Sequence, residues 1–137
     1  MIKMDTKLLF HNKEKIVFLI KETDYFFVNT IRRIIIEEVP TLAIEDITIN
    51  KNSSALYDEM IAHRLGLIPL KTDLKSYTLT KECKCKGEGC ARCSLNIILK
   101  AKGPCTVYSE NLKTRDPKIK SIYAKIPIIK LLKDQEL

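Results

Sequence analysis

The sequence has no apolar run that approaches the roughly 20 residues needed for a membrane-spanning helix. Its first residues, Met1 to Asp5, lack the charged and apolar segments of a secretory signal peptide. Internal repeats and low-complexity tracts are absent as well. We therefore expect an intracellular, cytoplasmic protein that does not bind a membrane.

Recognisable catalytic motifs are also missing. The sequence has only four glycines and no Gly-rich phosphate-binding loop. His63 is the most plausible general base, but no motif places a Ser or Cys nucleophile beside it. Asp58 and Glu59 form no familiar metal-binding or acid–base pair. We therefore predict no catalytic residue and expect His63 to serve packing or an interface.

The composition is that of a globular protein. Hydrophobic residues make up 45% and charged residues 30% of 137 positions, enough for one domain or two small ones. The net charge of +7 permits contact with nucleic acid, but the lysines are spread along the chain. Scattered charge is typical of a solvated surface, and we expect any association with DNA to be indirect.

Four of the five cysteines lie within eleven residues, which predicts a metal site. Expected to be reduced inside a cell, they do not suggest a disulfide framework. Gly87 and Gly89 supply a turn that brings the two pairs together. Such a four-thiolate set binds one structural zinc ion, with an iron–sulfur cluster or free redox thiols as alternatives. The four predicted ligands are Cys83, Cys85, Cys90 and Cys93. We expect the remote Cys105 to be a small buried apolar residue.

Periodicity predicts a mixture of helices and strands. Asp24 to Val39 has no Gly or Pro and is followed by Pro40, so we predict a helix there. A second helix is expected from Ala55 to Leu65, capped by Ser53 or Ser54. Short apolar runs at 15–21, 43–50, 77–80, 95–100 and 106–108 predict strands, 109–121 predicts a loop, and 123–132 predicts a strand interrupted by Pro127.

The first predicted helix is apolar on two sides. One arc of about 140° carries its main apolar face: Phe27, Val28, Ile31, Ile34, Ile35 and Val39. Phe26 and Ile36 lie outside this arc, on the side of Asn29, Arg32 and Arg33. A helix with this pattern is covered twice, by its own sheet and by a partner, and Arg beside large apolar groups is typical of interfaces. The alternative is that both arginines are ordinary solvated charges.

Three segments resemble a known family. These are Asn29–Ile34 (NTIRRI), Glu38–Ile44 (EVPTLAI) and Leu56–Leu70 (LYDEMIAHRLGLIPL). In order and spacing they are similar to the D subunit of archaeal RNA polymerase, the third-largest subunit of eukaryotic polymerase II and, more remotely, the amino-terminal domain of the bacterial alpha subunit. The resemblance covers nearly the whole chain.

The resemblance implies an α+β fold with two parts. Residues 1–50 and 127–137 would form an incomplete alpha-subunit-like dimerisation domain, and residues 51–126 an inserted, mainly-β domain with the cysteine loop 83–93. Many family members carry a structural zinc at this loop. Some archaeal members hold iron–sulfur clusters in a later insert that this sequence lacks. In the family, further strands and a helix follow the motif near Leu131–Leu137, which suggests a truncated chain or a separate polypeptide that supplies the missing half.

The same resemblance implies a non-catalytic assembly subunit of a nucleotidyltransferase. In the family, the first helix pairs with a smaller alpha-like partner, subunit L, and this heterodimer is the platform for the second-largest and then the largest subunit. Subunits N and P join it, and the arginine pair meets the second-largest subunit. The residues expected at partner interfaces are Phe26, Phe27, Asn29, Ile31, Arg32, Arg33, Ile36, His63 and Arg64.

Two other functions compete with this interpretation. A free-standing zinc-knuckle protein that binds nucleic acid would have aromatic and basic residues clustered beside the cysteines, and the aromatics are missing. A thiol–disulfide enzyme would open a helix with Cys-x-x-Cys after a strand, whereas Gly and Lys surround the motif here.

Overall fold

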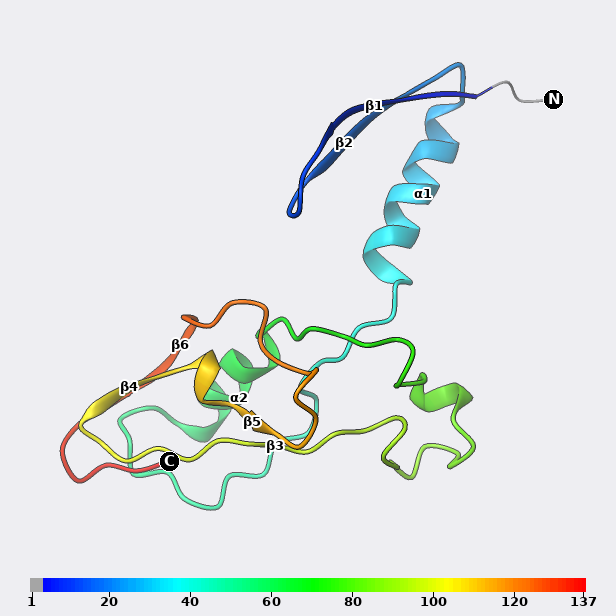
Figure 1. The fold of residues 1–137 in the computed structure, drawn as a ribbon. Coiled ribbons are helices and arrows are strands. Elements are labelled where there is room, and N and C mark those ends of the chain that lie inside the picture. Colours follow the sequence, from blue (N-terminus) through cyan, green and yellow to red (C-terminus); the bar gives the residue numbers. More distant parts are fainter. Residues whose placement is uncertain (1–3) are drawn as a thin grey trace. The chain divides into compact units, whose positions relative to one another are not determined.

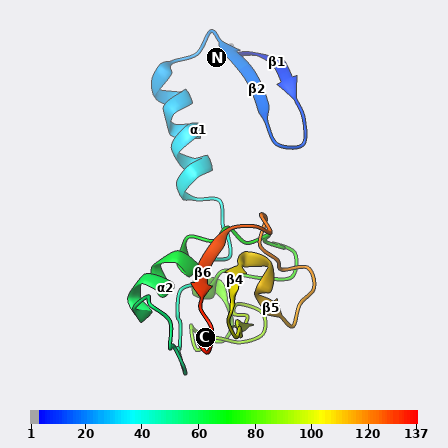
Figure 2. The same ribbon diagram turned by 90° about the vertical axis from the view of Figure 1, so that its left-hand side faces the viewer.

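The computed structural model describes residues 4–137 and divides the chain into two compact units, Met1–Val39 (unit 1) and Pro40–Leu137 (unit 2). Figures 1 and 2 show the elements of each unit, which we describe separately. None of the helices among the described residues is long and apolar enough to cross a membrane.

Unit 1 starts with a β-hairpin. Strand β1 (Asp5–His11) pairs antiparallel with β2 (Ile16–Lys21), and a bulge interrupts the register between Leu8 and Phe10. The Asn12 side chain stabilises the turn, because its Oδ1 accepts hydrogen bonds from the N–H groups of Glu14 and Lys15. The sequence predicts β2 but not β1, whose apolar run contains no β-branched residue after Thr6.

Helix α1 (Tyr25–Glu37) completes unit 1 and confirms the prediction from the sequence. The Asp24 carboxylate caps its first turn by accepting a hydrogen bond from the Phe26 N–H at 3.2 Å. The helix ends with Glu38, shortly before Pro40. No side chain of α1 is buried, and on its main apolar face only Val28 and Ile31 are half-buried. The expected cover by the protein's own sheet is therefore wrong for the described residues.

Unit 2 contains helix α2 (Asp58–Gly66), which starts three residues later than predicted. Asn52 explains the delay, because its side chain holds residues 52–58 in a local turn by donating to the Leu56 carbonyl and the Asp58 carboxylate. Ser53 and Ser54 are therefore not caps; Tyr57 occupies the cap position without a side-chain hydrogen bond.

Two small antiparallel sheets accompany α2. Strand β4 (Cys105–Tyr108) pairs with β6 (Pro127–Leu131), and β3 (Ile97–Ile98) pairs with β5 (Lys113–Thr114). Two short 3-10 helices, η1 (Thr80–Glu82) and η2 (Ser109–Asn111), lie in the connections. The predicted strands at 95–100, 106–108 and 123–132 are thus found in shortened or shifted form, whereas β5 and η2 fall in the segment predicted as a loop.

The core of unit 2 forms between α2 and the β4–β6 sheet. Ile61 and Ile128 have no exposed surface, and Ser109 is the buried polar residue among them. The Ser109 hydroxyl donates to the Tyr123 carbonyl and accepts from the Ile126 N–H, so its polar atom is satisfied. The clustered buried residues are Ile61, Leu65, Ile68, Leu70, Val107, Ile128, Ile129 and Leu131.

Three predictions from the sequence are wrong. Residues 43–50 are not a strand: within residues 4–137 their backbone has no hydrogen-bond partner in the chain, and exposed and half-buried side chains alternate only over residues 46–50. Residues 77–80 lead into η1 instead of forming a strand. Cys105 is exposed, because it is the first residue of β4 and burial on this side of the strand begins only two residues later, at Val107.

The predicted assignment of residues 1–50 and 127–137 to one domain and 51–126 to another stays a prediction. In this chain β6 pairs with β4 inside unit 2, and the boundary of the two compact units falls between Val39 and Pro40. Compactness of the present chain does not test which residues join a dimerisation domain in an assembly.

Candidate metal centre and interface residues

The four predicted cysteines come together in unit 2. Their sulfur atoms all lie within 4.8 Å of one another. The Sγ atoms of Cys83 and Cys90 are 3.5 Å apart, those of Cys85 and Cys93 are 3.5 Å apart, and those of Cys90 and Cys93 are 3.9 Å apart. Sulfurs at the corners of a tetrahedron with 2.3 Å metal–sulfur bonds are separated by about 3.8 Å. The cluster therefore has the size of a tetrahedral thiolate site.

Backbone turns build this cluster from the local sequence. The N–H of Lys86 donates to the Cys83 carbonyl at 3.1 Å, and the N–H of Cys93 donates to the Cys90 carbonyl at 2.9 Å, so that each cysteine pair is held by its own turn. Gly87 and Gly89 adopt φ values of +93° and +80° between the pairs. Because side chains disfavour this conformation, glycine is needed here, as the sequence predicts.

Hydrogen bonds shift the acidity of the thiols in different directions. The Gly87 N–H and the neighbouring thiols lower the pKa of Cys85 to about 6. The backbone N–H of Cys85 likewise lowers the pKa of Cys83. At Cys93 the Cys90 N–H acts in the same direction, but burial and hydrogen bonds to the other thiols outweigh it and raise the pKa to about 11.

These observations fit a metal ion with a structural role. Cys83 and Cys93 are buried and Cys85 and Cys90 half-buried, so four protein ligands would leave no open position for substrate. Thiolates are the ligands preferred by Zn²⁺ and by iron–sulfur clusters.

The predicted interface residues of α1 lie on the surface of unit 1. Phe26 and Ile36 expose 64% and 67% of their surface, and Phe27 exposes 46%. Arg32 donates from Nε to the Asn29 side chain at 3.4 Å, and Arg33 forms an exposed ion pair with Glu37 at 3.8 Å. Ile31 is half-buried. The guanidinium groups therefore remain accessible, and the assignment of these residues to partners stays a prediction.

The two predicted interface residues of α2 differ from each other. His63 is exposed. Arg64 donates from Nη1 to the Ile128 carbonyl at 2.7 Å and so links α2 to β6. Through this bond the charged guanidinium group of Arg64 has a polar partner beside the apolar core of unit 2. An additional role of either residue at an interface stays a prediction.

Sequence reasoning missed the exposed apolar residues of the hairpin. Leu8, Leu9 and Phe10 of β1 are each at least half exposed, and Ile16 and Phe18 of β2 expose 58% and 44%. The signal was present as the run LLF at residues 8–10, but the sequence analysis did not predict β1 and so did not predict an exposed hairpin surface. The hairpin therefore adds apolar surface to that of α1.

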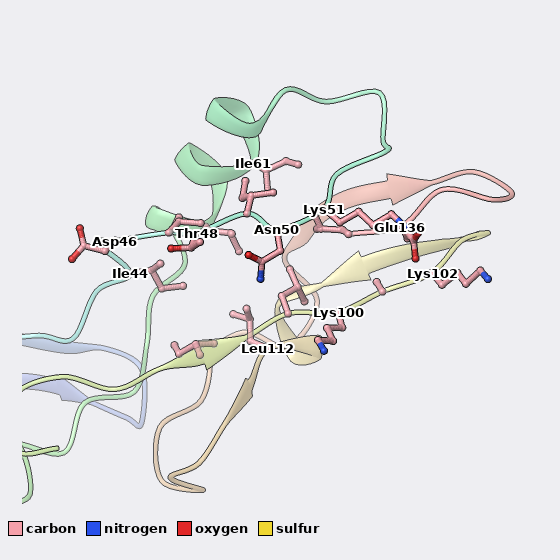
Figure 3. A pocket seen from close by; sticks show the side chains of 17 residues that line it. Ile44, Asp46, Thr48, Asn50, Lys51, Ile61, Lys100, Lys102, Leu112 and Glu136 are labelled. Carbon is pink, nitrogen blue, oxygen red and sulfur yellow. Dashed lines mark ion pairs between the residues drawn. The ribbon is translucent and has the colours of Figure 1, made fainter. Parts of the chain in front are cut away.

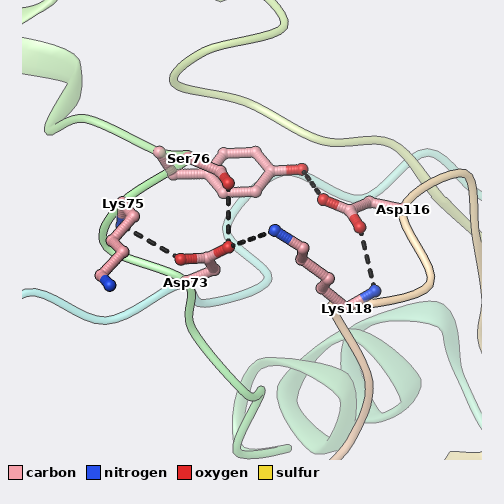
Figure 4. Close-up of polar contacts among 6 residues, drawn as sticks. Asp73, Lys75, Ser76, Asp116 and Lys118 are labelled. Carbon is pink, nitrogen blue, oxygen red and sulfur yellow. Dashed lines mark hydrogen bonds and ion pairs between the residues drawn. The ribbon is translucent and has the colours of Figure 1, made fainter.

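A polar cluster in unit 2 was also missed (Figure 4). Lys118 Nζ lies 3.0 Å from Asp73 Oδ2, and Ser76 donates to the same oxygen at 2.8 Å. The Lys118 ammonium group, followed by these hydrogen bonds, lowers the pKa of Asp73 to about 2. Tyr77 donates to Asp116 at 3.0 Å, and burial together with this carboxylate raises the tyrosine pKa. The cluster joins the segments 73–77 and 116–118.

Comparison with known proteins agrees with the resemblance of the three motifs. The model of the RNA polymerase Rpb3/RpoA insert domain family matches residues 43–137. The chain is 44% identical to a DNA-directed RNA polymerase subunit Rpo3 of Methanosphaera stadtmanae over 139 residues, which cover 98% of this chain and 51% of the relative. Rpo3 subunits of Methanosarcina mazei and Methanothermobacter thermautotrophicus are 44% and 41% identical over 98% of this chain.

The chain spans about half the length of these relatives. The family model covers more than two thirds of the chain and includes α2, the cysteine cluster and both sheets of unit 2. The chain therefore belongs to the RNA polymerase Rpb3/RpoA insert domain family.

Proposed function

We propose that this chain is an assembly subunit of DNA-directed RNA polymerase that binds a smaller alpha-like subunit. The observation that carries the proposal is the similarity to Rpo3 subunits along 98% of the chain. In this role the protein contributes no catalytic group to nucleotide addition. It provides a surface on which the second-largest and then the largest subunit assemble, and subunits N and P join the same assembly.

The surface of unit 1 supports an assembly role. Its hairpin and helix expose large apolar side chains, with Phe26 and Ile36 among the most exposed. A monomeric soluble protein rarely exposes contiguous apolar patches larger than a few hundred Å². Removal of this surface from water by a partner helix and sheet supplies the free energy that unit 1 alone cannot gain.

The metal centre supports a structural role for unit 2 in that assembly. A closed four-cysteine site orders residues 83–93 without creating a reactive position. We assign one Zn²⁺ to this site, held by Cys83, Cys85, Cys90 and Cys93. We further place the protein in the cytoplasm, where transcription in archaeal-type cells occurs.

Affinity purification tests the proposal. The full chain carries a tag, is expressed in an archaeal cell with native polymerase, and is recovered under mild conditions. We expect the alpha-like partner and the second-largest subunit to be recovered with it. Ile36→Asp should reduce this recovery, because a charge enters the apolar face, while the neighbouring exposed variant Glu38→Gln should not. Recovery of the wild-type chain without polymerase subunits, or with bound RNA alone, would contradict the proposal.

A further inference from the structure

The segment that carries the four cysteines adds nothing to the core of unit 2. Within residues 78–94, which we call the metal loop, every residue is exposed except the four cysteines. Neither the core cluster nor the half-buried residues packed against it include a residue of this loop. An open groove of about 660 Å³ lies against core residues such as Ile61, and the metal loop does not line it either (Figure 3). Apolar packing on the core therefore does not hold the loop in place.

Hydrogen bonds close the metal loop on itself. The N–H of Thr78 donates to the Arg92 carbonyl at 3.0 Å and joins the two ends of the loop, which we call its neck. All other hydrogen bonds of residues 78–94 within the described part of the chain also have both partners inside the loop. The loop is thus a separate module, and its position on unit 2 depends on the residues that flank the neck.

The polar cluster lies directly beside this neck (Figure 4). Tyr77 precedes Thr78, and its hydroxyl donates to Asp116 Oδ2 at 3.0 Å. Four residues earlier, Asp73 accepts a hydrogen bond from Lys118 Nζ at 3.0 Å. Both bonds join the segment that enters the metal loop to the turn at residues 116–118. Because Tyr77 and Asp116 are both half-buried, their charge-assisted bond competes less with water than a bond between exposed groups would.

The turn at residues 116–118 is itself fixed to the body of unit 2. The Thr114 hydroxyl donates to the Asp116 carbonyl at 2.7 Å and lies 3.1 Å from the Ile119 carbonyl oxygen. Thr114 belongs to β5, and Ile119 exposes only 1% of its surface. The sheet and the buried isoleucine therefore determine where the Asp116 carboxylate lies.

We propose that Tyr77 and Asp116 position the metal loop on unit 2 and couple metal binding in the loop to the order of residues 114–119. With all four cysteines as ligands, the interior of the loop is ordered up to its neck, and the adjacent Tyr77 hydroxyl is held opposite Asp116. In the other direction, the bond to Asp116 restricts the neck before the metal binds. This restriction lowers the conformational entropy that is lost when the four ligands come together. Tyr77 is thus a positioning residue that acts through the neck.

A coupling of this kind is reciprocal. If the bond between Tyr77 and Asp116 raises the metal affinity by a given factor, metal binding strengthens the bond by the same factor. The ion pair of Asp73 with Lys118 contributes less, because the lysine side chain is 64% exposed. The inference rests on the metal site assigned under the proposed function but not on assembly into a polymerase.

The zinc affinity of the whole chain tests the first direction. Tyr77→Phe removes the hydroxyl and keeps the aromatic ring. We expect the zinc dissociation constant, measured by competition with a chelator of known affinity, to rise by about fivefold or more. Tyr123→Phe, at a tyrosine with 65% exposure, is the matched control and should leave the constant unchanged. Equal zinc affinities of Tyr77→Phe and the wild type would overturn the proposal. A wild-type chain that binds no zinc would overturn it together with the metal assignment, whatever polymerase subunits the chain recovers.

Amide hydrogen exchange tests the reverse direction. The Ile119 N–H donates to the Asp116 carbonyl at 3.2 Å and reports on the turn. We expect removal of zinc by a chelator to accelerate exchange of this amide about fivefold or more in the wild type, and less than about twofold in Tyr77→Phe. The amide of Ser109, which donates to the Ile126 carbonyl at 2.9 Å, is the internal control and should not respond.

Two results of the exchange experiment would contradict the coupling. An undiminished response of Ile119 in Tyr77→Phe would show that the metal loop acts on the turn without the tyrosine hydroxyl. An equal acceleration at Ser109 would show that zinc stabilises unit 2 as a whole and not through the neck.

Discussion

Units 1 and 2 differ in where their apolar side chains lie. In unit 2, α2 and β6 bring residues such as Ile61 and Ile128 together until neither has exposed surface. In unit 1, α1 has the clearer amphipathic pattern, yet none of its side chains is buried. The comparison shows that a periodic pattern identifies an apolar face but does not specify the element that covers it.

Size accounts for part of the difference. Unit 1 consists of 39 residues, close to the lower limit of about 40 below which chains usually need disulfides, metals or partners to fold. Unit 2 is larger and also holds the cysteine cluster. It therefore has both a core and a candidate metal site, whereas the large apolar side chains of unit 1 lie on its surface.

Removal of the metal should have the largest effect on unit 2. Structural zinc sites in small modules contribute apparent binding free energies on the order of 10–16 kcal/mol. We expect elemental analysis to give about one zinc per chain, and chelation to abolish the amide protection of residues 83–93. Cys93→Ser should reproduce this loss, while Cys105→Ser, which changes an exposed cysteine outside the cluster, should not. Stoichiometric iron with visible charge-transfer absorption would show that the site holds an iron–sulfur cluster instead.

Truncation of one isoleucine in each unit tests the contrast between their interiors. Ile61→Ala removes a fully buried side chain and should lower the free energy of unfolding of unit 2 by about 2–5 kcal/mol. Ile36→Ala, at a position with 67% exposure, should change stability by less than about 0.5 kcal/mol. Chemical denaturation followed by circular dichroism measures both variants. A large loss of stability in Ile36→Ala would mean that unit 1 has a core of its own.

The arginine pair of α1 tests whether its surface binds a partner. Arg32→Ala with Arg33→Ala should weaken capture of the second-largest subunit by on the order of 2 kcal/mol, because arginines beside apolar groups are frequent hot spots. The fold should not change, since both side chains are exposed and Arg33 makes only a surface ion pair. Quantitative pull-down with purified subunits measures the loss. Wild-type affinity in the double variant would show that both arginines are ordinary solvated charges and not interface residues.

Asp73 stabilises the fold of unit 2 in a pH-dependent way, with a smaller expected effect than the changes above. The carboxylate has a pKa of about 2, below its ordinary value of 3.8. Because the folded state has the lower pKa, ionised Asp73 stabilises the fold above about pH 4, and this contribution disappears as the pH falls toward 2. Thermal unfolding between pH 5 and 2 should show a weaker pH dependence for Asp73→Asn than for the wild type, since any loss of metal at low pH affects both proteins alike. Glu45→Gln, at an exposed carboxylate, serves as the control and should follow the wild type.

The sequence predicted those features that depend on local spacing. The helix Tyr25–Glu37 could be predicted because its apolar residues recur at helical spacing and Asp24, a good capping residue, precedes them. The cysteine cluster could be predicted because two pairs of cysteines lie close together with glycines between them. Both signals are local, because each lies within about fifteen consecutive residues. Gly87 and Gly89, the two glycines predicted to supply the turn between the pairs, both have positive φ.

Features that depend on distant segments were predicted less well. Residues 46–50 alternate as a strand does, but pairing requires a second edge, and among the described residues no edge pairs with them. The delayed start of α2 depends on an Asn52 side chain that competes for the Leu56 carbonyl. The contact between Asp73 and Lys118 joins residues 45 positions apart and leaves no trace in local periodicity.

The exposed hairpin of unit 1 also has a consequence for synthesis on the ribosome. Unit 1 precedes unit 2 in the chain, and at typical rates of about 5–20 residues per second the 98 residues of unit 2 take roughly 5–20 s to follow. During this interval Leu8, Leu9 and Phe10 have already left the ribosome with at least half of their surface uncovered. The nascent hairpin therefore exposes apolar surface that a chaperone can bind before unit 2 is complete.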